Sequence, residues 1–270
     1  MKIIFIRHGD PDYAKDSLTP KGWREAKALA AFLTAPGGMG WDIDHFYCSP
    51  LGRARDTAGP TLRALGAKAD IYDFFREFNR EAIDPRTGKK RIPWDYYPAD
   101  WTKDERAFDG LRWETMPIFE ESPEVAAYFH EIGCRLDKLI LKYGYQRDGR
   151  FYRVRESNHQ TICIFCHFGV ASMLICHLLN LSPVAFLNGS FIPPTGITLL
   201  QTEERDPGIA YFRMNFMGST PHLALAGEPL SGSGLFQECA SDPFRRIGAI
   251  HSLREVCPEN EPENKILLKP

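Results

Sequence analysis

The sequence predicts an α/β fold, a three-layer sandwich in which a mostly parallel central sheet carries helices on both faces. Short apolar runs bounded by polar or turn residues alternate along the chain with longer segments whose apolar residues recur at helical spacing. Repeated strand–helix units form parallel sheets, because each helix returns the chain to the edge at which the next strand begins. A long segment without clear periodicity interrupts this alternation and is expected to form an inserted cap.

The expected strands are the apolar runs at residues 3–6, 43–48, 69–73, 161–166, 195–202 and 209–216. Each run has the length of a strand and is followed by turn or capping residues. The last two runs are expected to close the sheet as a pair.

The expected helices begin at a capping residue followed by proline, which is a typical helix start. Thr19-Pro20 opens a helix that Pro36-Gly37-Gly38 ends, and Ser49-Pro50 opens one that reaches Leu65 and is expected to kink at Pro60. Ser122-Pro123 opens a long helix that closes at Gly144, and residues 170–179 form the helix after the strand at 161–166.

Two stretches depart from this rhythm. Residues 79–117 mix the side chains of Trp94, Tyr96, Tyr97, Trp101 and Trp113 with charges of both signs, and we expect them to form a cap over the strand ends. An ordinary surface excursion packed on the core is the alternative. Residues 226–270 are an irregular C-terminal extension. We therefore expect one α/β domain over residues 1–270, with this cap and this extension.

Composition excludes several classes of protein. Of the 270 residues 43% are hydrophobic and 25% charged, which is ordinary for a globular protein, and the net charge of −2 disfavours nucleic-acid or anionic-membrane partners. The four apolar residues after Lys2 are too few for a signal peptide, and no run is long enough to span a bilayer. The seven cysteines, an odd number mostly within apolar runs, suggest reduced thiols. We expect a cytoplasmic protein, and the oligomeric state is left open.

Charged and imidazole side chains follow the strands that are expected to be parallel. Arg7 and His8 follow the first strand, Arg53 the second, Glu77 the third and His167 the strand at 161–166. Ligands bind outside the carboxyl ends of the strands in open α/β sheets. Convergence of two histidines, arginines and a carboxylate at this edge predicts a site for a phosphate group.

These segments resemble the histidine phosphatase superfamily, in its phosphoglycerate-mutase-like branch. The resemblance is carried by Arg7-His8-Gly9, by the stretch Ser49-Pro-Leu-Gly-Arg53-Ala with Thr57-Ala58, by Glu77 and by His167. Leu18-Thr-Pro-Lys-Gly22 is similar to the first-helix signature of that family, and Ser219-Thr-Pro-His222-Leu223 to a late segment. The combination is specific, whereas Arg-His-Gly alone is not.

The resemblance implies a role for each of these residues. His8 would be the nucleophile that takes the phosphoryl group as a phosphohistidine, and Glu77 would be the general acid and base. Arg7, Arg53 and His167 would bind the phosphoryl oxygens. It implies a small-molecule phosphomonoester as substrate and neither a metal nor a cofactor. Arg55 and Glu81 are the nearest competitors of Arg53 and Glu77, since one register error would exchange them.

Departures from the family pattern favour hydrolysis over phosphoryl transfer between substrates. Mutases follow Arg-His-Gly with a Glu-Ser-x-x-Asn pattern, whereas this chain has Asp10-Pro-Asp-Tyr13, and the Arg-His-Tyr-Gly run of the mutases is absent after Glu77. Phe168 occupies the position directly after the second histidine, where some acid phosphatases carry their proton donor, so Glu77 is the better candidate. Mutase-type transfer remains an alternative.

Two other classes of function stay open at this stage. A metallohydrolase would bind a metal through His8, His167, Asp10 and Glu77, although two arginines beside a divalent cation are unfavourable. A non-catalytic module would use the same basic site to hold a phosphorylated ligand. Cys163-Ile-Phe-Cys166-His167 spells a haem-attachment pattern, but it lies in an apolar strand, in which the two cysteines are expected to face opposite sides and not to form a redox pair.

Overall fold

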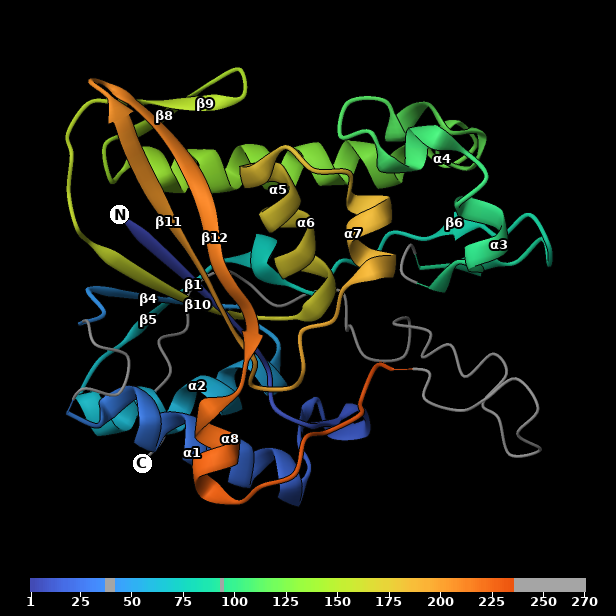
Figure 1. Ribbon diagram of the computed structural model, residues 1–270. Helices are drawn as coiled ribbons and strands as arrows, with labels where there is room; N and C mark the ends of the chain where they lie inside the picture. Colours follow the sequence, from blue (N-terminus) through green and yellow to red (C-terminus); the bar gives the residue numbers. More distant parts are fainter. Residues whose placement is uncertain (37–41, 93–94, 236–270) are drawn as a thin grey trace.

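The computed structural model describes residues 1–36, 42–92 and 95–235, and its core is one central sheet (Figure 1). The eight strands of this sheet lie in the order β5 (Ala69–Ile71), β4 (His45–Cys48), β10 (Thr161–Cys166), β1 (Lys2–Arg7), β11 (Ile197–Asp206), β12 (Ile209–Ser219), β9 (Phe151–Val154) and β8 (Tyr145–Asp148). Two small ribbons accompany it, β2 (Pro11–Asp12) with β3 (Ser17–Leu18) and β6 (Ala82–Ile83) with β7 (Lys90–Arg91).

The half of the sheet from β5 to β1 is parallel, because β4 pairs with β5, β10 with β4 and β1 with β10 in parallel register. The predicted α/β fold is therefore confirmed, with the predicted parallel pairing in this half of the sheet. Beyond β1 the neighbours are antiparallel through β11, β12, β9 and β8. The β8–β9 hairpin was not predicted, since its sequence, Tyr-Gln-Arg-Asp followed by Phe-Tyr-Arg-Val, is only weakly apolar.

The central strands are buried on both faces, which explains their continuous apolar sequence. Alternate residues of β1 and β10 enter two separate cores, Ile3, Phe5 and Ile164 in one and Ile4, Ile6 and Phe165 in the other. Cys163 and Cys166 likewise lie in different cores and are free thiols. The predicted opposite orientation of these two cysteines is confirmed.

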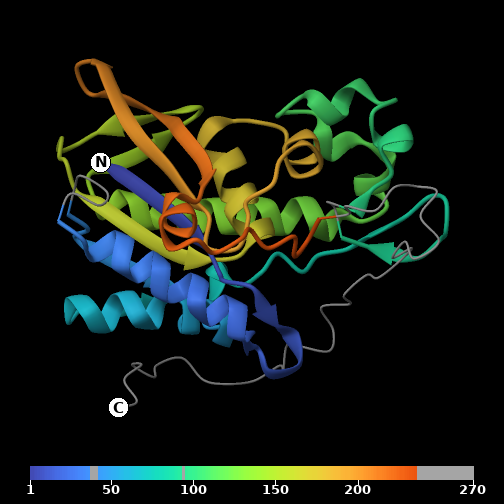
Figure 2. The same ribbon diagram turned by 60° about the horizontal axis from the view of Figure 1, so that its bottom comes forward.

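Helices cover both faces of the sheet (Figures 1 and 2). One face carries α1 (Pro20–Thr34), α2 (Gly52–Leu65) and α8 (Pro221–Ala226). The other carries α5 (Pro123–Leu141), α6 (Phe168–Leu179) and α7 (Pro183–Gly189). Within the described residues no helix is both long and apolar enough to cross a membrane.

The helix starts agree with the sequence at one position and differ at another. Thr19 caps α1 as predicted, because its side chain accepts a hydrogen bond from the Gly22 amide. Ser49 does not cap α2: the N-cap is Leu51, and α2 runs through Pro60 to its end. Ser49 lies two residues before this N-cap, and its hydroxyl contacts His167, as described below. Gly37 and Gly38, expected to end α1, lie outside the described residues.

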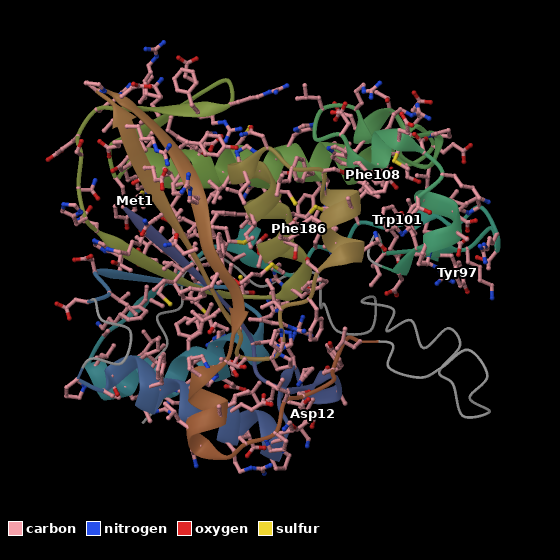
Figure 3. The ribbon with its side chains drawn as sticks, in the orientation of Figure 1. Met1, Asp12, Tyr97, Trp101, Phe108 and Phe186 are labelled. Carbon is pink, nitrogen blue, oxygen red and sulfur yellow. The ribbon has the colours of Figure 1, made fainter. Side chains whose placement is uncertain are left out.

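The segment 79–117 contains only short elements: β6, β7, α3 (Pro98–Trp101), η4 (Glu105–Phe108) and η5 (Trp113–Thr115), followed by α4 (Pro117–Glu120). Trp113 and Tyr96 are buried and belong to the same core as α5 and α6, while Trp94 lies outside the described residues. Ser182 Oγ at the start of α7 donates to the Ala107 carbonyl at 2.5 Å. In Figure 3, Phe108, Trp101 and Tyr97 lie to the right of Phe186, which is on α7. That the segment caps the strand ends stays a prediction.

The first part of the C-terminal extension returns to the body of the protein. Glu228 accepts hydrogen bonds from Arg24 Nε at 2.7 Å and from Lys21 Nζ at 3.2 Å, both on α1. Ser231 Oγ donates to Asp10, and the Ser233 carbonyl accepts from Arg7 Nη2 at 3.1 Å. Residues 228–235 are therefore anchored beside the end of β1. Residues 236–270 lie outside the described residues.

Gly133 on α5 lies where this helix packs against His177 of α6. A Cβ at Gly133 would lie 2.5 Å from His177 Nδ1, and the His177 ring is held by Asp137, with 2.9 Å between Nε2 and Oδ2. Gly133→Ala is expected to destabilise the protein by about 1–3 kcal/mol, although alanine is the better helix former. Urea unfolding measures this free energy.

The control is the same substitution in a His177→Ala background. Without the ring, Gly133→Ala is expected to stabilise by about 0.5–1 kcal/mol, because only helix propensity then acts. Equal effects in the two backgrounds would show that the ring does not set the requirement for glycine.

Candidate active site

Arg7 and His8 stand where β1 leaves the sheet. His8 Nδ1 lies 2.7 Å from the Gly9 carbonyl oxygen, which can only accept, so Nδ1 carries the proton and Nε2 keeps its lone pair. Burial, and the positive charges of Arg53 and Arg7, hold the pKa of His8 well below its usual value. The imidazole is therefore neutral at physiological pH, with a fixed tautomer and a nucleophilic Nε2.

His167 follows β10 and lies beside His8, with 5.2 Å between the two ring centroids. Its Nε2 is 2.8 Å from Ser49 Oγ, and the Leu51 amide donates to the same oxygen at 3.2 Å. The hydroxyl can then donate to Nε2, which leaves the proton of His167 on Nδ1. Burial and the charge of Arg53 keep the pKa of His167 well below its usual value.

The two arginines are buried and held by different partners. Arg7 donates from Nη1 to the Ile192 carbonyl at 2.7 Å, in addition to its bond to Ser233. Arg53, in the first turn of α2, donates from Nη1 to Asp16 Oδ1 at 2.7 Å. Arg7 and Arg53 are 4% and 2% exposed, so these partners hold two positive charges at positions that bulk water hardly reaches.

Glu77 follows β5 and the short helix η2 (Asp73–Phe75) and reaches the same place. Its Oε1 accepts from the Phe78 amide at 2.8 Å and from the Val170 amide at 3.0 Å. Burial raises the pKa of Glu77, and the charge of Arg53 and these amide hydrogen bonds only partly oppose the rise. A carboxyl group with this tendency to keep its proton suits a general acid.

Three buried nitrogen atoms in this cluster have no hydrogen-bond partner among the described residues. They are Arg7 Nε, Arg53 Nε and His167 Nδ1, and each can donate. Buried donors are nearly always paired in folded proteins, since an unpaired one costs about 1–3 kcal/mol. A group of unpaired donors around a neutral imidazole is the arrangement that an oxyanion would satisfy.

Several supporting residues were not predicted from the sequence. Thr57 Oγ1 accepts from the Gly9 amide at 2.9 Å, and the Thr195 amide lies 3.1 Å from the Arg7 carbonyl oxygen and 3.2 Å from that of His8. His222 Nε2 in turn lies 2.8 Å from Thr195 Oγ1. Thr57 and His222 lie within motifs quoted in the sequence analysis, so those motifs could have identified them. Asp16 and Thr195 gave none, because each acts only through a partner far away in the sequence.

Close backbone approach is required at Gly52, the first residue of α2. A Cβ there would lie 2.0 Å from the Asp16 carbonyl oxygen. The absence of a side chain lets the Gly52 amide donate to Asp16 Oδ2 at 2.6 Å, so that Asp16 bridges the start of α2 and Arg53.

The competing residues lie in other surroundings. Arg55 lines a cavity of about 380 Å³ together with Trp23 and Leu62, and Arg53 is not among the residues that line it. The Asp10 carboxylate accepts from Thr19 Oγ1 at 2.7 Å and from Ser231 Oγ. In residues 1–36, 42–92 and 95–235 no group of three or more histidine, cysteine, aspartate or glutamate side chains is arranged to hold a metal ion.

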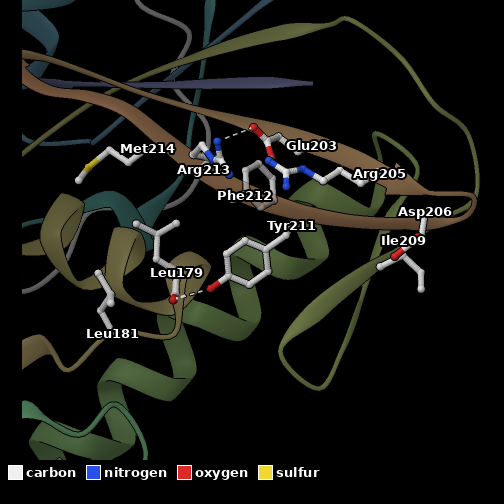
Figure 4. Close-up of a pocket in the computed structure, with 10 residues that line it drawn as sticks. All are labelled: Leu179, Leu181, Glu203, Arg205, Asp206, Ile209, Tyr211, Phe212, Arg213 and Met214. Atoms are coloured by element: carbon white, nitrogen blue, oxygen red, sulfur yellow. Dashed lines mark hydrogen bonds and ion pairs between the residues drawn. The ribbon is translucent and has the colours of Figure 1, made fainter.

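A larger cavity, about 530 Å³, lies between the β11–β12 hairpin and the end of α6, where Leu179, Leu181 and Tyr211 line it (Figure 4). None of the five predicted site residues is among its lining residues. The structure thus brings Arg7, His8, Arg53, Glu77 and His167 together at a different place, the carboxyl edge of the parallel strands.

The chain was also compared with models of known protein families and with known proteins. Residues 3–127 match the model of the histidine phosphatase superfamily (branch 1), which bears out the resemblance seen in the sequence. No curated protein sequence matches this chain.

Solved structures similar to this chain include two phosphatases. One is phosphoserine phosphatase from Entamoeba histolytica in complex with 3-phosphoglyceric acid (20% identity, TM-score 0.51, covering 82% of this chain and 98% of that one). Another is mycobacterial glucosyl-3-phosphoglycerate phosphatase (18% identity, TM-score 0.52, covering 81% and 98%). At these identities the likeness establishes a shared fold.

The support that His222 gives to Thr195 should depend on pH. Burial lowers the pKa of His222 from 6.5 to about 4, so the unfolded chain binds its proton first as the pH falls. The stabilisation is complete above about pH 6.5 and is lost on going toward pH 4. Between pH 7 and pH 4.5 the wild type is expected to lose on the order of 2 kcal/mol through this residue.

His222→Gln removes the titration, so its free energy of unfolding in urea should depend less steeply on pH by that amount. His159→Gln, at an exposed histidine, is the matched control and should follow the wild type. Parallel profiles for wild type and His222→Gln would contradict the assignment.

Proposed function

We propose that this protein, whose residues 3–127 match the model of the histidine phosphatase superfamily, hydrolyses small phosphomonoesters through a covalent phosphohistidine on His8. The observation that carries the proposal is the set of unpaired buried donors, Arg7 Nε, Arg53 Nε and His167 Nδ1, around an imidazole whose Nε2 is bare. Such donors match the equatorial oxygens of a phosphoryl group in transfer, where charge must be stabilised without reorganisation.

In the first step Nε2 of His8 attacks phosphorus. The N–P bond forms while the bond from phosphorus to the ester oxygen breaks, and Glu77 gives its proton to the departing alcohol oxygen. The Gly9 carbonyl accepts from Nδ1–H throughout and stabilises the positive charge that develops on the ring. The raised pKa of Glu77 supports the acid role, and the lowered pKa of His8 supports the nucleophilic role.

In the second step water attacks the phosphohistidine. The Glu77 carboxylate takes a proton from that water, the N–P bond breaks, and inorganic phosphate and neutral His8 are regenerated. No metal ion or cofactor takes part in either step. The names of the similar structures, which include phosphoserine and glucosyl-3-phosphoglycerate phosphatases, support a phosphorylated metabolite as the substrate class.

Two alternatives are weaker. Mutase-type transfer would need the family residues that are missing after Gly9 and after Glu77 in this sequence. A non-catalytic phosphate-binding module would have no use for a carboxyl group with a raised pKa beside a neutral imidazole.

His8→Ala is expected to lower kcat/KM for phosphomonoesters by at least about 10³-fold, because it removes the group that bonds to phosphorus. Wild-type protein quenched during turnover of a ³²P-labelled ester should carry acid-labile, base-stable label, and the variant should carry none. Turnover should persist in EDTA.

His45→Ala, at an exposed histidine at the start of β4, is the matched control and should keep wild-type turnover. Comparable activity in His8→Ala would refute the mechanism. Phosphate binding without turnover or labelling of the wild type, across a broad set of esters, would favour the binding module.

Glu77→Gln is expected to lower kcat/KM for ethyl phosphate by about 10²-fold or more, because the ethoxide must be protonated as it leaves and kcat/KM reports only this first step. The loss should be less than about tenfold for 4-nitrophenyl phosphate, whose leaving group needs no proton. The alkaline limb of the wild-type pH profile, where rising pH deprotonates Glu77, should vanish for the ethyl ester. Glu81→Gln tests the neighbouring carboxylate and should leave the turnover of both esters unchanged. If Glu77→Gln lowered turnover of both esters equally, Glu77 would have a structural role.

A further inference from the structure

Aromatic rings surround the guanidinium groups of the site. Arg7 Cζ lies 5.3 Å from the ring centroid of Phe191 and 5.8 Å from that of Phe168, and Arg53 Cζ lies 5.5 Å from that of Tyr13. The rings of Phe168 and Phe191 are 6.0 Å apart and tilted. All three side chains are only partly buried, so each presents surface beside a group that would bind the phosphoryl oxygens.

The phenylalanine pair lies next to the proton donor. The amide of Val170, two residues after Phe168, holds the Glu77 carboxyl group at 3.0 Å. The alcohol that Glu77 protonates therefore leaves toward the start of α6, where Phe168 and Phe191 stand. Apolar rings at that point favour an alcohol moiety that can pack against them.

Within the described residues, the arginines whose charges act most strongly on the pKa of His167 offer no partner for a second anionic group. They are Arg53, Arg7 and Arg76. The first two are assigned to the phosphoryl group, and Arg76 Nε is 2.6 Å from Asp73 Oδ1 in an ion pair. A carboxylate on the alcohol would lie among phenyl rings without a cation of this set to balance it, which is costly.

We propose that the preferred substrates are phosphomonoesters whose alcohol carries an apolar ring close to the ester oxygen, and that Phe191 and Phe168 bind that ring. This assignment rests on the proposed hydrolase function. It names a substrate class that differs from carboxylate-bearing phosphoesters such as phosphoglycolate.

The test compares kcat/KM for benzyl, ethyl and carboxymethyl esters of phosphate, the last being phosphoglycolate. All three are primary alkyl esters, so differences in binding are not masked by the much better leaving group of an aryl ester. Benzyl phosphate is expected to exceed ethyl phosphate by about tenfold or more, the factor that about 1.4 kcal/mol of contact supplies. Phosphoglycolate is expected to be the poorest substrate.

Phe191→Ala should lower the ratio of kcat/KM for benzyl to ethyl phosphate by about tenfold, mainly through KM for the benzyl ester. Phe151→Ala is the matched control, since Phe151 on β9 also packs against a guanidinium, that of Arg153 at 5.8 Å, but in another part of the sheet. It should leave the ratio unchanged. Phe191→Leu keeps apolar volume and should retain part of the preference, which guards against a folding defect as the explanation.

The outcomes separate the two proposals. Hydrolysis of all three esters that depends on His8 but shows no preference for benzyl phosphate, or prefers phosphoglycolate, would overturn the substrate class and leave the hydrolase function intact. An unchanged benzyl-to-ethyl ratio in Phe191→Ala would also overturn it. Absence of turnover for every ester would refute the hydrolase function, and the substrate class with it.

Discussion

The parallel pairing of β1 with β10 is the constraint on which the site depends. Arg7 is registered with Cys166, and the His8 amide donates to the Cys166 carbonyl at 2.9 Å. The residues that follow each strand, His8 and His167, are therefore neighbours although they are far apart in the chain. A slip of either strand by one residue would turn the imidazole that follows it to the opposite face of the sheet, away from the other imidazole.

Burial of charge at this edge is balanced by a small number of fixed partners. Carbonyl oxygens of Ile192 and Ser233 hold Arg7, and the carboxylate of Asp16 holds Arg53. Each arginine keeps a donor that no described group satisfies. The fold thus stabilises both cations but does not neutralise them completely, and the remaining electrostatic cost is what a bound oxyanion would relieve.

Burial at this edge shifts the pKa values of the two histidines and of the glutamate in opposite directions. Burial disfavours the charged form of every titratable group, so it lowers the pKa of His8 and His167 and raises that of Glu77. The arginines lower the pKa of the histidines further and oppose the rise at Glu77. These shifts favour a neutral imidazole and a carboxyl group that keeps its proton, the forms that nucleophilic attack and general-acid catalysis require.

The sequence alone determined the strand at the N-terminus, the apolar strand at 161–166, the Thr19 cap and the residues at the parallel strand ends, because hydrophobic period and capping chemistry are local. It did not predict the β8–β9 hairpin, which has few apolar residues, and these pack against residues far away in the sequence. It also assigned Ser49 to a helix cap, whereas the tertiary structure directs that hydroxyl to His167. The roles of Asp16 and Thr195 were decided only by the fold, which also places Arg53, the arginine that the sequence favoured over Arg55, beside the two histidines. Register between distant strands and the direction of α2 fix these contacts, and neither is encoded in any short segment of the chain.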